Sequence, residues 1–404
     1  MKRQWLECLV CGARYAVGPM WRGCQECAAE KGAPLEVRYD YGSIDEDFGC
    51  DGNAPGIWRW HQLLPSISAG SPVSLNEGTT PLCRLECGQN GLALWLKNES
   101  VNPTWSYKDR ANTVNITLAK ELGFKRVAAI STGNHGNSTA AYASAANMVS
   151  VVFCHRDISS LQTSLMRLYG AQVFRGGNRN LMMSRLVGSG SWFPTSIIDP
   201  FSGCANPFGV EGFKTIAFEI FFQLERQVPD RVFVPVGSGD GLYGIWKGFL
   251  ELKKIGLSDR VPKMIACQAL GAAPYFRAFS KRLRQMEPLK EARTIALSIS
   301  EEEGGRPALW AVYDSEGAVL SCSDEEITQA ASELARAGYA VEPASAATLA
   351  CAKKEFRKPE SSSETWVLIG TGAYVKWAET LNRQFEPLRL LEPEFERVED
   401  LLEV

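Results

Sequence analysis

The sequence has almost no excess of charge and no long apolar run. Its 404 residues carry a formal net charge of −3, whereas nucleic-acid-binding proteins normally present a basic patch. No stretch approaches the ~18 apolar residues of a membrane span, and residues 1–8 lack the apolar run of a secretory signal. We therefore expect a cytoplasmic protein that binds neither nucleic acid nor a membrane.

The composition is otherwise that of an ordinary globular protein. Hydrophobic residues make up 45% and charged residues 22% of the chain, which are typical values for such proteins. A chain of this length exceeds the size of one hydrophobic core, so we expect at least two domains. Most of the 12 cysteines lie singly in apolar segments, as Cys154 and Cys267 do. That placement is typical of reduced core residues in a cytosolic protein.

Four cysteines near the N-terminus are arranged differently. They form two Cys-x2-Cys pairs, made by Cys8 with Cys11 and Cys24 with Cys27. Each pair can wrap a turn around one metal ion, and four thiolates complete a tetrahedron. The spacing predicts a structural zinc site in a ribbon-like segment over residues 1–40. Disulfides or incidental cysteines are the alternative.

From residue 76 onward, short apolar runs alternate with helical stretches. This alternation predicts βαβ units and parallel sheets, and therefore an α/β fold. Residues 41–75 are interpreted as a connector, residues 76–390 as the main body, and the acidic residues 391–404 as a peripheral tail. The predicted strands are Leu92–Lys97, Arg126–Ile130, Val149–Cys154, Gln172–Phe174, Arg231–Val236, Lys263–Ala269 and Trp366–Ile369. The predicted helices include Asp109–Leu122, Ser138–Ala146, Ser159–Leu168 and Glu211–Glu225.

Lys108 is the first candidate for chemistry. It ends a Pro-Thr-x-Ser turn in Asn102–Arg110 and precedes a predicted helix, so it lies near the positive end of a helix dipole. An amine attacks an aldehyde cofactor only when it is unprotonated, and the flanking Trp105 and Tyr107 can provide partial desolvation. A surface lysine at the start of a helix is the alternative interpretation.

Two turns rich in glycine follow predicted strands. In Ser131–Ser138, the Asn134 amide can donate to a phenolate oxygen, and backbone amides can bind a carboxylate. In Val236–Leu242, successive backbone amides can form a nest for a phosphate, provided that one acidic side chain there points away. A simple turn with helix caps is the alternative for each. The predicted phosphate loop consists of Gly237, Ser238, Gly239, Asp240 and Gly241.

Thr371 follows the last predicted strand, in Trp366–Gly372. Its hydroxyl can form one hydrogen bond with a ring nitrogen, but it would not hold a proton there as an aspartate would. That property favours elimination over transamination.

Together these segments resemble the threonine synthase family of pyridoxal-phosphate enzymes. The resemblance spans roughly residues 5–380. It implies the tryptophan-synthase-β-like fold (fold type II), with two open parallel-sheet α/β domains preceded by a small zinc ribbon. A smaller subdomain, at about 112–205, is inserted in the larger domain. It also implies pyridoxal 5′-phosphate, structural Zn²⁺, an amino-acid substrate and a homodimer. The matching segments are Tyr39–Tyr41, Asn102–Arg110, Ser131–Asn134, Gly212–Glu219, Val234–Gly239, Ile245–Phe249, Val341–Ala347 and Gly370–Gly372.

The resemblance also implies roles for single residues. Lys108 matches the catalytic lysine that forms a Schiff base with the cofactor, Asn134 the partner of the phenolate oxygen, and Thr371 the partner of the ring nitrogen. Residues 237–241 match the phosphate loop. Candidate substrate-binding residues are Ser131, Thr132 and Gly133 for the carboxylate, Asn137 and Arg110 for the leaving phosphate, and Trp105 at the substrate end of the pocket. Arg110 equally suits a structural ion pair.

The chain departs from the family pattern in several places. Trp105 stands where these enzymes usually have glycine, Ala111 replaces another glycine, and His135-Gly136 resembles threonine dehydratases instead. The phosphate loop reads Ser-Gly-Asp-Gly, in place of Asn-Gly-Gly-Asn. The predicted function is elimination of phosphate from O-phosphohomoserine and addition of water to give threonine. The alternatives are β-replacement or β-elimination on O-phosphoserine or a similar amino acid, and a non-catalytic regulatory or binding protein.

Overall fold

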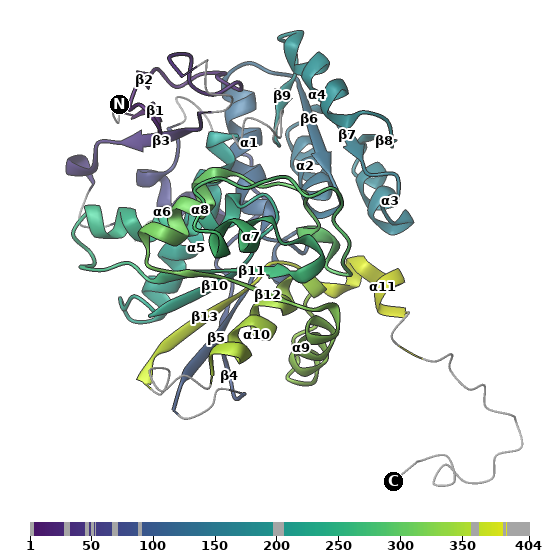
Figure 1. The fold of residues 1–404 in the computed structure, drawn as a ribbon. Helices are drawn as coiled ribbons and strands as arrows, with labels where there is room; N and C mark the ends of the chain where they lie inside the picture. Colours follow the sequence, from purple (N-terminus) through teal and green to yellow (C-terminus); the bar gives the residue numbers. More distant parts are fainter. Residues whose placement is uncertain are drawn as a thin grey trace, which may run out of the picture.

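In the described residues, the computed structural model of the chain has three β-sheets (Figure 1). It describes residues 4–27, 33–44, 48–49, 52, 54–66, 72–87, 91–196, 206–356, 363–382 and 385. The predicted acidic tail, 391–404, lies outside the described residues. None of the helices in the described parts of the chain is both long and apolar enough to cross a membrane.

The N-terminal sheet is small and antiparallel, with the order β2-β1-β3. Its strands are Gln4–Cys8 (β1), Arg14–Tyr15 (β2) and Leu35–Tyr39 (β3). Leu6 in β1 and Val37 in β3 are fully buried. Polar contacts also attach β3 to the main body, since the Tyr243 hydroxyl donates to Glu36 at 3.0 Å and Lys247 Nζ donates to the Val37 carbonyl.

The large sheet has the order β12-β11-β10-β13-β5-β4. Its strands are Leu82–Leu85 (β4), Ala93–Asn98 (β5), Arg231–Pro235 (β10), Lys263–Ala269 (β11), Ala318–Cys322 (β12) and Thr365–Gly370 (β13). All neighbouring pairs are parallel except β4 with β5. The predicted parallel sheet therefore has one antiparallel edge strand.

The second sheet of the main body is entirely parallel, with the order β8-β7-β6-β9. Its strands are Arg126–Ser131 (β6), Val149–Cys154 (β7), Gln172–Arg175 (β8) and Phe193–Pro194 (β9). It falls within the predicted inserted subdomain at about 112–205. Figure 1 shows this sheet beside the large one, with helices packed around both.

Helices connect the strands and cover the sheets (Figure 1). The central pair, α5 and α6, packs between the N-terminal sheet and the large sheet, and every residue of α5 from Pro207 to Phe221 is buried. The α-helices are Lys108–Glu121 (α1), Asn134–Ala145 (α2), Ser160–Leu168 (α3), Arg179–Gly188 (α4), Pro207–Gln223 (α5), Asp240–Lys254 (α6), Pro274–Ser280 (α7), Arg306–Asp314 (α8), Asp324–Arg336 (α9), Pro343–Glu355 (α10) and Ala378–Asn382 (α11).

The two elements that coincide with their predicted ranges, β7 and β11, are buried parallel strands. β6, β8, β10 and α3 each differ by one residue. β4, β9 and β12 were not predicted. Two of these, β4 and β12, are edge strands with several half-buried positions, and β9 has only two residues. A weak apolar pattern is therefore the reason that they were missed.

Candidate functional site

The candidate site lies where Lys108 begins α1. The loop before this lysine is joined to the chain after β13 by two backbone hydrogen bonds. Tyr107 N donates to Thr371 O at 2.9 Å and Ala373 N donates to Trp105 O at 3.0 Å, and together they form an antiparallel β-bridge between Ser106 and Gly372. The predicted lysine loop and the predicted ring-nitrogen partner, more than 250 residues apart in the sequence, are therefore neighbours.

Side-chain hydrogen bonds also fix the loop before Lys108. The Asp109 carboxylate accepts from Thr104 N at 2.7 Å and from Thr104 Oγ1 at 2.6 Å. Lys376 Nζ donates to the Thr104 carbonyl at 2.7 Å, and burial lowers the pKa of this lysine to about 8. Trp105 is held with a φ of 58°, a left-handed conformation that a bulky side chain rarely adopts. Such strain persists only where the surroundings fix it.

Lys108 lies among aromatic and acidic groups. Its Nζ is 4.8 Å from the ring centre of Tyr107 and 5.2 Å from that of Phe213. Burial disfavours the ammonium, but Tyr107, Asp240 and Glu301 outweigh it and raise the pKa of Lys108. The partial desolvation expected from its neighbours therefore does not lower the pKa of Lys108.

The Ser131–Ser138 turn joins β6 to α2. The Ser131 hydroxyl oxygen accepts from Gly133 N at 3.0 Å and from Gly136 N at 2.8 Å, which fixes the start of the helix. Asn134 and Asn137 are buried, and the side-chain oxygen of each lacks a hydrogen-bond partner. Unpaired buried polar atoms are rare and often mark a site that a ligand completes. The turn therefore has the properties of a ligand-binding loop and is more than a capped turn.

His135, one of the departures from the family pattern, lies in the same turn. Its Nε2 is 3.2 Å from Thr195 Oγ1. Burial, with a smaller contribution from the charge of Lys108, lowers the pKa of His135 to about 3. The imidazole is therefore neutral at physiological pH.

The predicted phosphate loop joins β10 to α6. Gly239 has a φ of 98°, and a Cβ there would lie 2.3 Å from Tyr275 Oη. A Cβ on Gly241 would lie 2.7 Å from the Tyr107 ring, so this loop reaches the neighbour of Lys108. Asp240 accepts from Ser238 Oγ at 3.3 Å, and burial raises its pKa.

Thr371 lies at the end of β13 and is buried. Its hydroxyl is 3.0 Å from Ser345 Oγ and donates to Glu342 Oε1 at 3.2 Å. Asn134 Nδ2 donates to the other oxygen of Glu342 at 2.8 Å. The two predicted ring partners, from different sheets, therefore meet at one carboxylate.

Arg110 does not belong to this site. Its side chain is 0% exposed, and each of its guanidinium nitrogens donates to Glu99, Glu219 or both at 2.7–2.8 Å. Thr80 and Thr215 accept further bonds from it. With its donors engaged in a buried cluster, Arg110 has none to offer a substrate phosphate. The structure thus corrects the substrate-binding assignment in favour of the structural ion pair.

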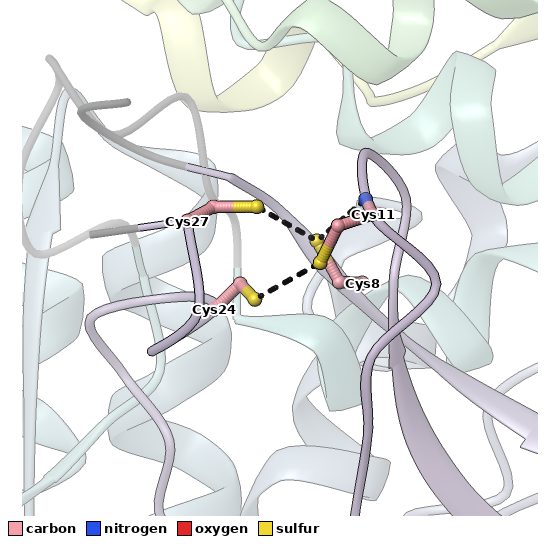
Figure 2. A group of neighbouring side chains, drawn as sticks. All are labelled: Cys8, Cys11, Cys24 and Cys27. Atoms are coloured by element: carbon pink, nitrogen blue, oxygen red, sulfur yellow. Dashed lines mark hydrogen bonds between the residues drawn. The ribbon is translucent and has the colours of Figure 1, made fainter. Parts of the chain in front are cut away.

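The four N-terminal cysteines form a second candidate site (Figure 2). Their sulfur atoms all lie within 4.8 Å of one another. Cys8 and Cys27 are 3.9 Å apart and Cys11 and Cys24 3.6 Å. Metal–sulfur bonds of about 2.3 Å place the sulfurs of a tetrahedron roughly 3.8 Å apart. The arrangement can therefore hold one metal ion, and none of the four is in a disulfide.

The comparisons with known proteins agree with this geometry. The model of the family described as "Pyridoxal-phosphate dependent enzyme" matches residues 73–372. Threonine synthase from Methanocaldococcus jannaschii is 39% identical over 86% of this chain and 86% of its own length. Threonine synthase from Methanosarcina acetivorans is 35% identical over 93% of each chain. The chain belongs to the threonine synthase family of pyridoxal-phosphate-dependent enzymes. The predicted lyase class is thereby confirmed, and the non-catalytic alternative loses its support.

Solved structures of more distant proteins show the same fold. Maize serine racemase has a TM-score of 0.63 at 20% identity and covers 76% of this chain and 92% of its own. O-ureido-L-serine synthase has a TM-score of 0.63 at 17% identity, covering 80% of this chain and 98% of its own. These similarities confirm the predicted fold type II architecture.

Sequence reasoning missed three charged residues of the site. Glu342 lies within the segment Val341–Ala347 that was noted for its family resemblance, yet no role was assigned to it. Lys376 and Glu301 lie outside the motifs. Burial raises the pKa of Glu301 to about 7, although Arg179 and Lys108 counteract the shift. Only the folded chain brings these residues to Lys108, so no local pattern would have shown them.

Proposed function

We propose that the protein converts O-phosphohomoserine and water to threonine and inorganic phosphate. In this reaction protons leave Cα and Cβ, the bond between Cγ and the phosphate oxygen breaks, water adds a hydroxyl at Cβ, and protons return to Cγ and Cα. The observation that supports it most directly is the convergence of four chain-distant segments on Lys108. The names of the curated relatives point to the same activity.

The residues around Lys108 fit pyridoxal 5′-phosphate. The glycine cradle at 237–241 is a feature that a bound phosphate explains, and Asn134 Nδ2 keeps a second hydrogen besides the one that it donates to Glu342. Lys108 would form the covalent link, Asn134 would meet the phenolate oxygen, residues 237–241 the phosphate, and Thr371 the ring nitrogen. When bound, the cofactor ring withdraws electrons from the substrate α carbon.

Lys108 has two tasks in this proposal. Its Nζ would hold the cofactor aldehyde and, once freed by the substrate amine, would remove the α proton as a general base. Both tasks need the neutral amine. Asp240 and Glu301 are acidic groups that favour the charged form and raise the pKa of Lys108.

We assign substrate binding to residues of the Ser131–Ser138 turn and to Trp105. Ser131, Thr132 and Gly133 precede the first turn of α2, where backbone amides favour a carboxylate. Asn137 Nδ2 donates to Gln162 Oε1 and to Gly133 O, so its amide is oriented from α3. Trp105, 39% exposed, lies three residues from Lys108 and would limit the size of the substrate.

Further parts of the proposal concern the whole protein. The four cysteines bind a structural Zn²⁺, which stabilises the N-terminal segment 1–40 ahead of the connector 41–75. The catalytic region 76–390 carries the inserted subdomain at about 112–205. We also propose a homodimer in the cytoplasm, which acts on an amino-acid substrate.

One observation favours a second reaction. The strained backbone of Trp105 sets a large side chain three residues before Lys108, at a position where the family pattern described above has glycine. A side chain of this size would suit O-phosphoserine, which is one methylene shorter than O-phosphohomoserine, and therefore β-replacement or β-elimination.

Product analysis tests the proposal. Holoenzyme is incubated separately with O-phosphohomoserine, O-phosphoserine and threonine, and phosphate, threonine and 2-oxo acids are measured. The proposal expects threonine and phosphate in equal amounts from O-phosphohomoserine. Absence of phosphate release from that compound contradicts it, and release from O-phosphoserine alone supports the second reaction.

A further inference from the structure

The N-terminal ribbon, made of β1–β3 and the four cysteines, lies against the helix that begins in the predicted phosphate loop (Figure 1). That helix, α6, begins at Asp240, and β3 contacts its first two turns. The Tyr243 hydroxyl donates to Glu36 at 3.0 Å, and Lys247 Nζ donates to the Val37 carbonyl oxygen. All four of these side chains are buried. β3 therefore holds α6 near the end that would meet the cofactor phosphate.

Buried charges join β3, α5 and α6 into one network. Glu211 of α5 accepts from the Tyr39 hydroxyl of β3 and from Lys247 Nζ of α6, each at 2.6 Å. Lys214 Nζ donates to Glu211 at 2.6 Å and lies 2.8 Å from Glu251 of α6. Removing one partner from a buried charge cluster leaves the others uncompensated, which is strongly destabilising. The position of α6 therefore depends on a folded β3.

Both cysteine pairs are tied to the residues that lead into β3. Leu9, which follows Cys8, donates its backbone N–H to Pro34 O, and Cys24 N donates to Ala33 O, each at 3.0 Å. Residues of the ribbon and of the phosphate loop also line one cavity together, namely Leu9, Pro34, Leu35, Ser238, Gly239 and Asp240. Ordering of the cysteine pairs therefore affects the packing directly beside the phosphate loop.

The ribbon is too small to maintain this arrangement unaided. β1 and β3 have five residues each, and β2 has two. In segments of this size, metal binding supplies free energy of folding, so loss of the metal favours an unfolded ribbon. Unfolding withdraws Glu36 and Val37 from α6 and Leu9 from the loop. A phosphate bound at residues 237–241 would favour the ordered start of α6, and hence the docked ribbon.

We propose that the N-terminal ribbon positions the cofactor's phosphate loop, so that metal binding at the four cysteines and cofactor binding strengthen each other. The proposal rests on the phosphate-loop and zinc assignments of the proposed function. Coupling between two sites is reciprocal. The metal must therefore raise cofactor affinity by the same factor by which the cofactor raises metal affinity.

Two titrations measure the coupling in the wild-type, full-length chain. Fluorescence titration gives the affinity for pyridoxal phosphate before and after zinc is removed by a chelator, with circular dichroism to confirm folding. Competition with a chromophoric chelator gives zinc affinity with and without pyridoxal phosphate. We expect zinc to raise cofactor affinity about tenfold, within the roughly 5–150-fold range typical of coupled sites, and the cofactor to raise zinc affinity equally.

A pair of matched substitutions locates the coupling. Glu36→Ala removes the acceptor of the Tyr243 hydroxyl on the face toward α6. Glu7→Ala is the control, because Glu7 lies directly opposite Glu36 in the β1–β3 ladder. The described partners of Glu7 all belong to the ribbon, namely Trp5, Arg14 and Arg38. At full zinc content, we expect Glu36→Ala to bind pyridoxal phosphate about fivefold more weakly than wild type, and Glu7→Ala within about twofold.

Equal cofactor affinity with and without zinc overturns the proposal, as does a wild-type protein that binds no zinc. Equal cofactor affinity of zinc-loaded Glu36→Ala and Glu7→Ala also overturns it. If zinc removal unfolds the main body, these two variants alone decide. None of the readouts needs a substrate, so a wrong substrate assignment leaves the test valid. Wild-type protein that binds no pyridoxal phosphate would contradict the proposed function itself.

Discussion

Lys108 and Arg110 are two residues apart on the same helix, but their surroundings differ fundamentally. Every guanidinium nitrogen of Arg110 donates to a buried carboxylate, and Lys97 joins the same cluster through Glu219 at 2.6 Å. Around Lys108, in contrast, the buried oxygens of Asn134 and Asn137 lack partners. The comparison sets a buried charge cluster whose donors are all engaged against buried amide oxygens that have no partner.

Loss of Lys108 should have the largest effect on activity. Lys108→Ala is expected to lower turnover at least roughly a thousandfold, because it removes both the covalent attachment and the general base. Thermal stability should fall less than in Arg110→Met, since Lys108 forms no ion pair with a described residue at the distances seen for Arg110. Steady-state kinetics and a melting curve measure the two effects, and near-normal turnover would contradict the assignment.

Loss of Arg110 should have the largest effect on stability. Arg110→Met leaves Glu99 and Glu219 buried without their partner, which typically costs about 3–5 kcal/mol of unfolding free energy. Denaturant unfolding measures it. Arg260→Met is the control, because its ion pair with Asp230 is exposed and is expected to contribute about 1 kcal/mol or less. Equal losses of unfolding free energy in Arg110→Met and Arg260→Met would contradict the structural role of the buried Arg110 cluster.

Zinc removal tests the N-terminal segment. Cys8→Ser should abolish stoichiometric zinc and lower the unfolding free energy by roughly 2 kcal/mol or more, because metal binding contributes to folding in such segments. Cys154→Ser is the control at a buried cysteine outside the cluster. Metal analysis and melting curves decide, and unchanged zinc content in Cys8→Ser would refute the site.

His135 gives the smallest predicted effect. Below about pH 6.5 the unfolded chain takes up a proton that the folded imidazole, with its pKa lowered to about 3, does not accept. The contribution of His135 to the unfolding free energy is therefore present above pH 6.5 and is lost on acidification. Between about pH 7.5 and 5.5 the loss is about 1.4 kcal/mol, and His135→Asn should remove that part of the pH dependence in denaturant titrations.

Much of the fold and part of the site could be predicted from the sequence. Buried parallel strands such as Val149–Cys154 can be recognised in the sequence by their unbroken apolar runs. The lysine loop and the glycine turns were found because their chemistry is local. Arg110 was ambiguous, since its partners Glu99 and Glu219 lie on other elements. Glu342 was missed because its role appears only when α2 and β13 meet.

The most direct test of the account is to locate the cofactor lysine. Holoenzyme is reduced with borohydride, digested, and the modified peptide is identified by mass spectrometry. Lys376 is a real competitor, because it is buried near Thr104 and its pKa is lowered to about 8. The account predicts the cofactor mass on Lys108, and its absence from the Lys108→Ala variant. Modification of Lys376 in the wild type would contradict it.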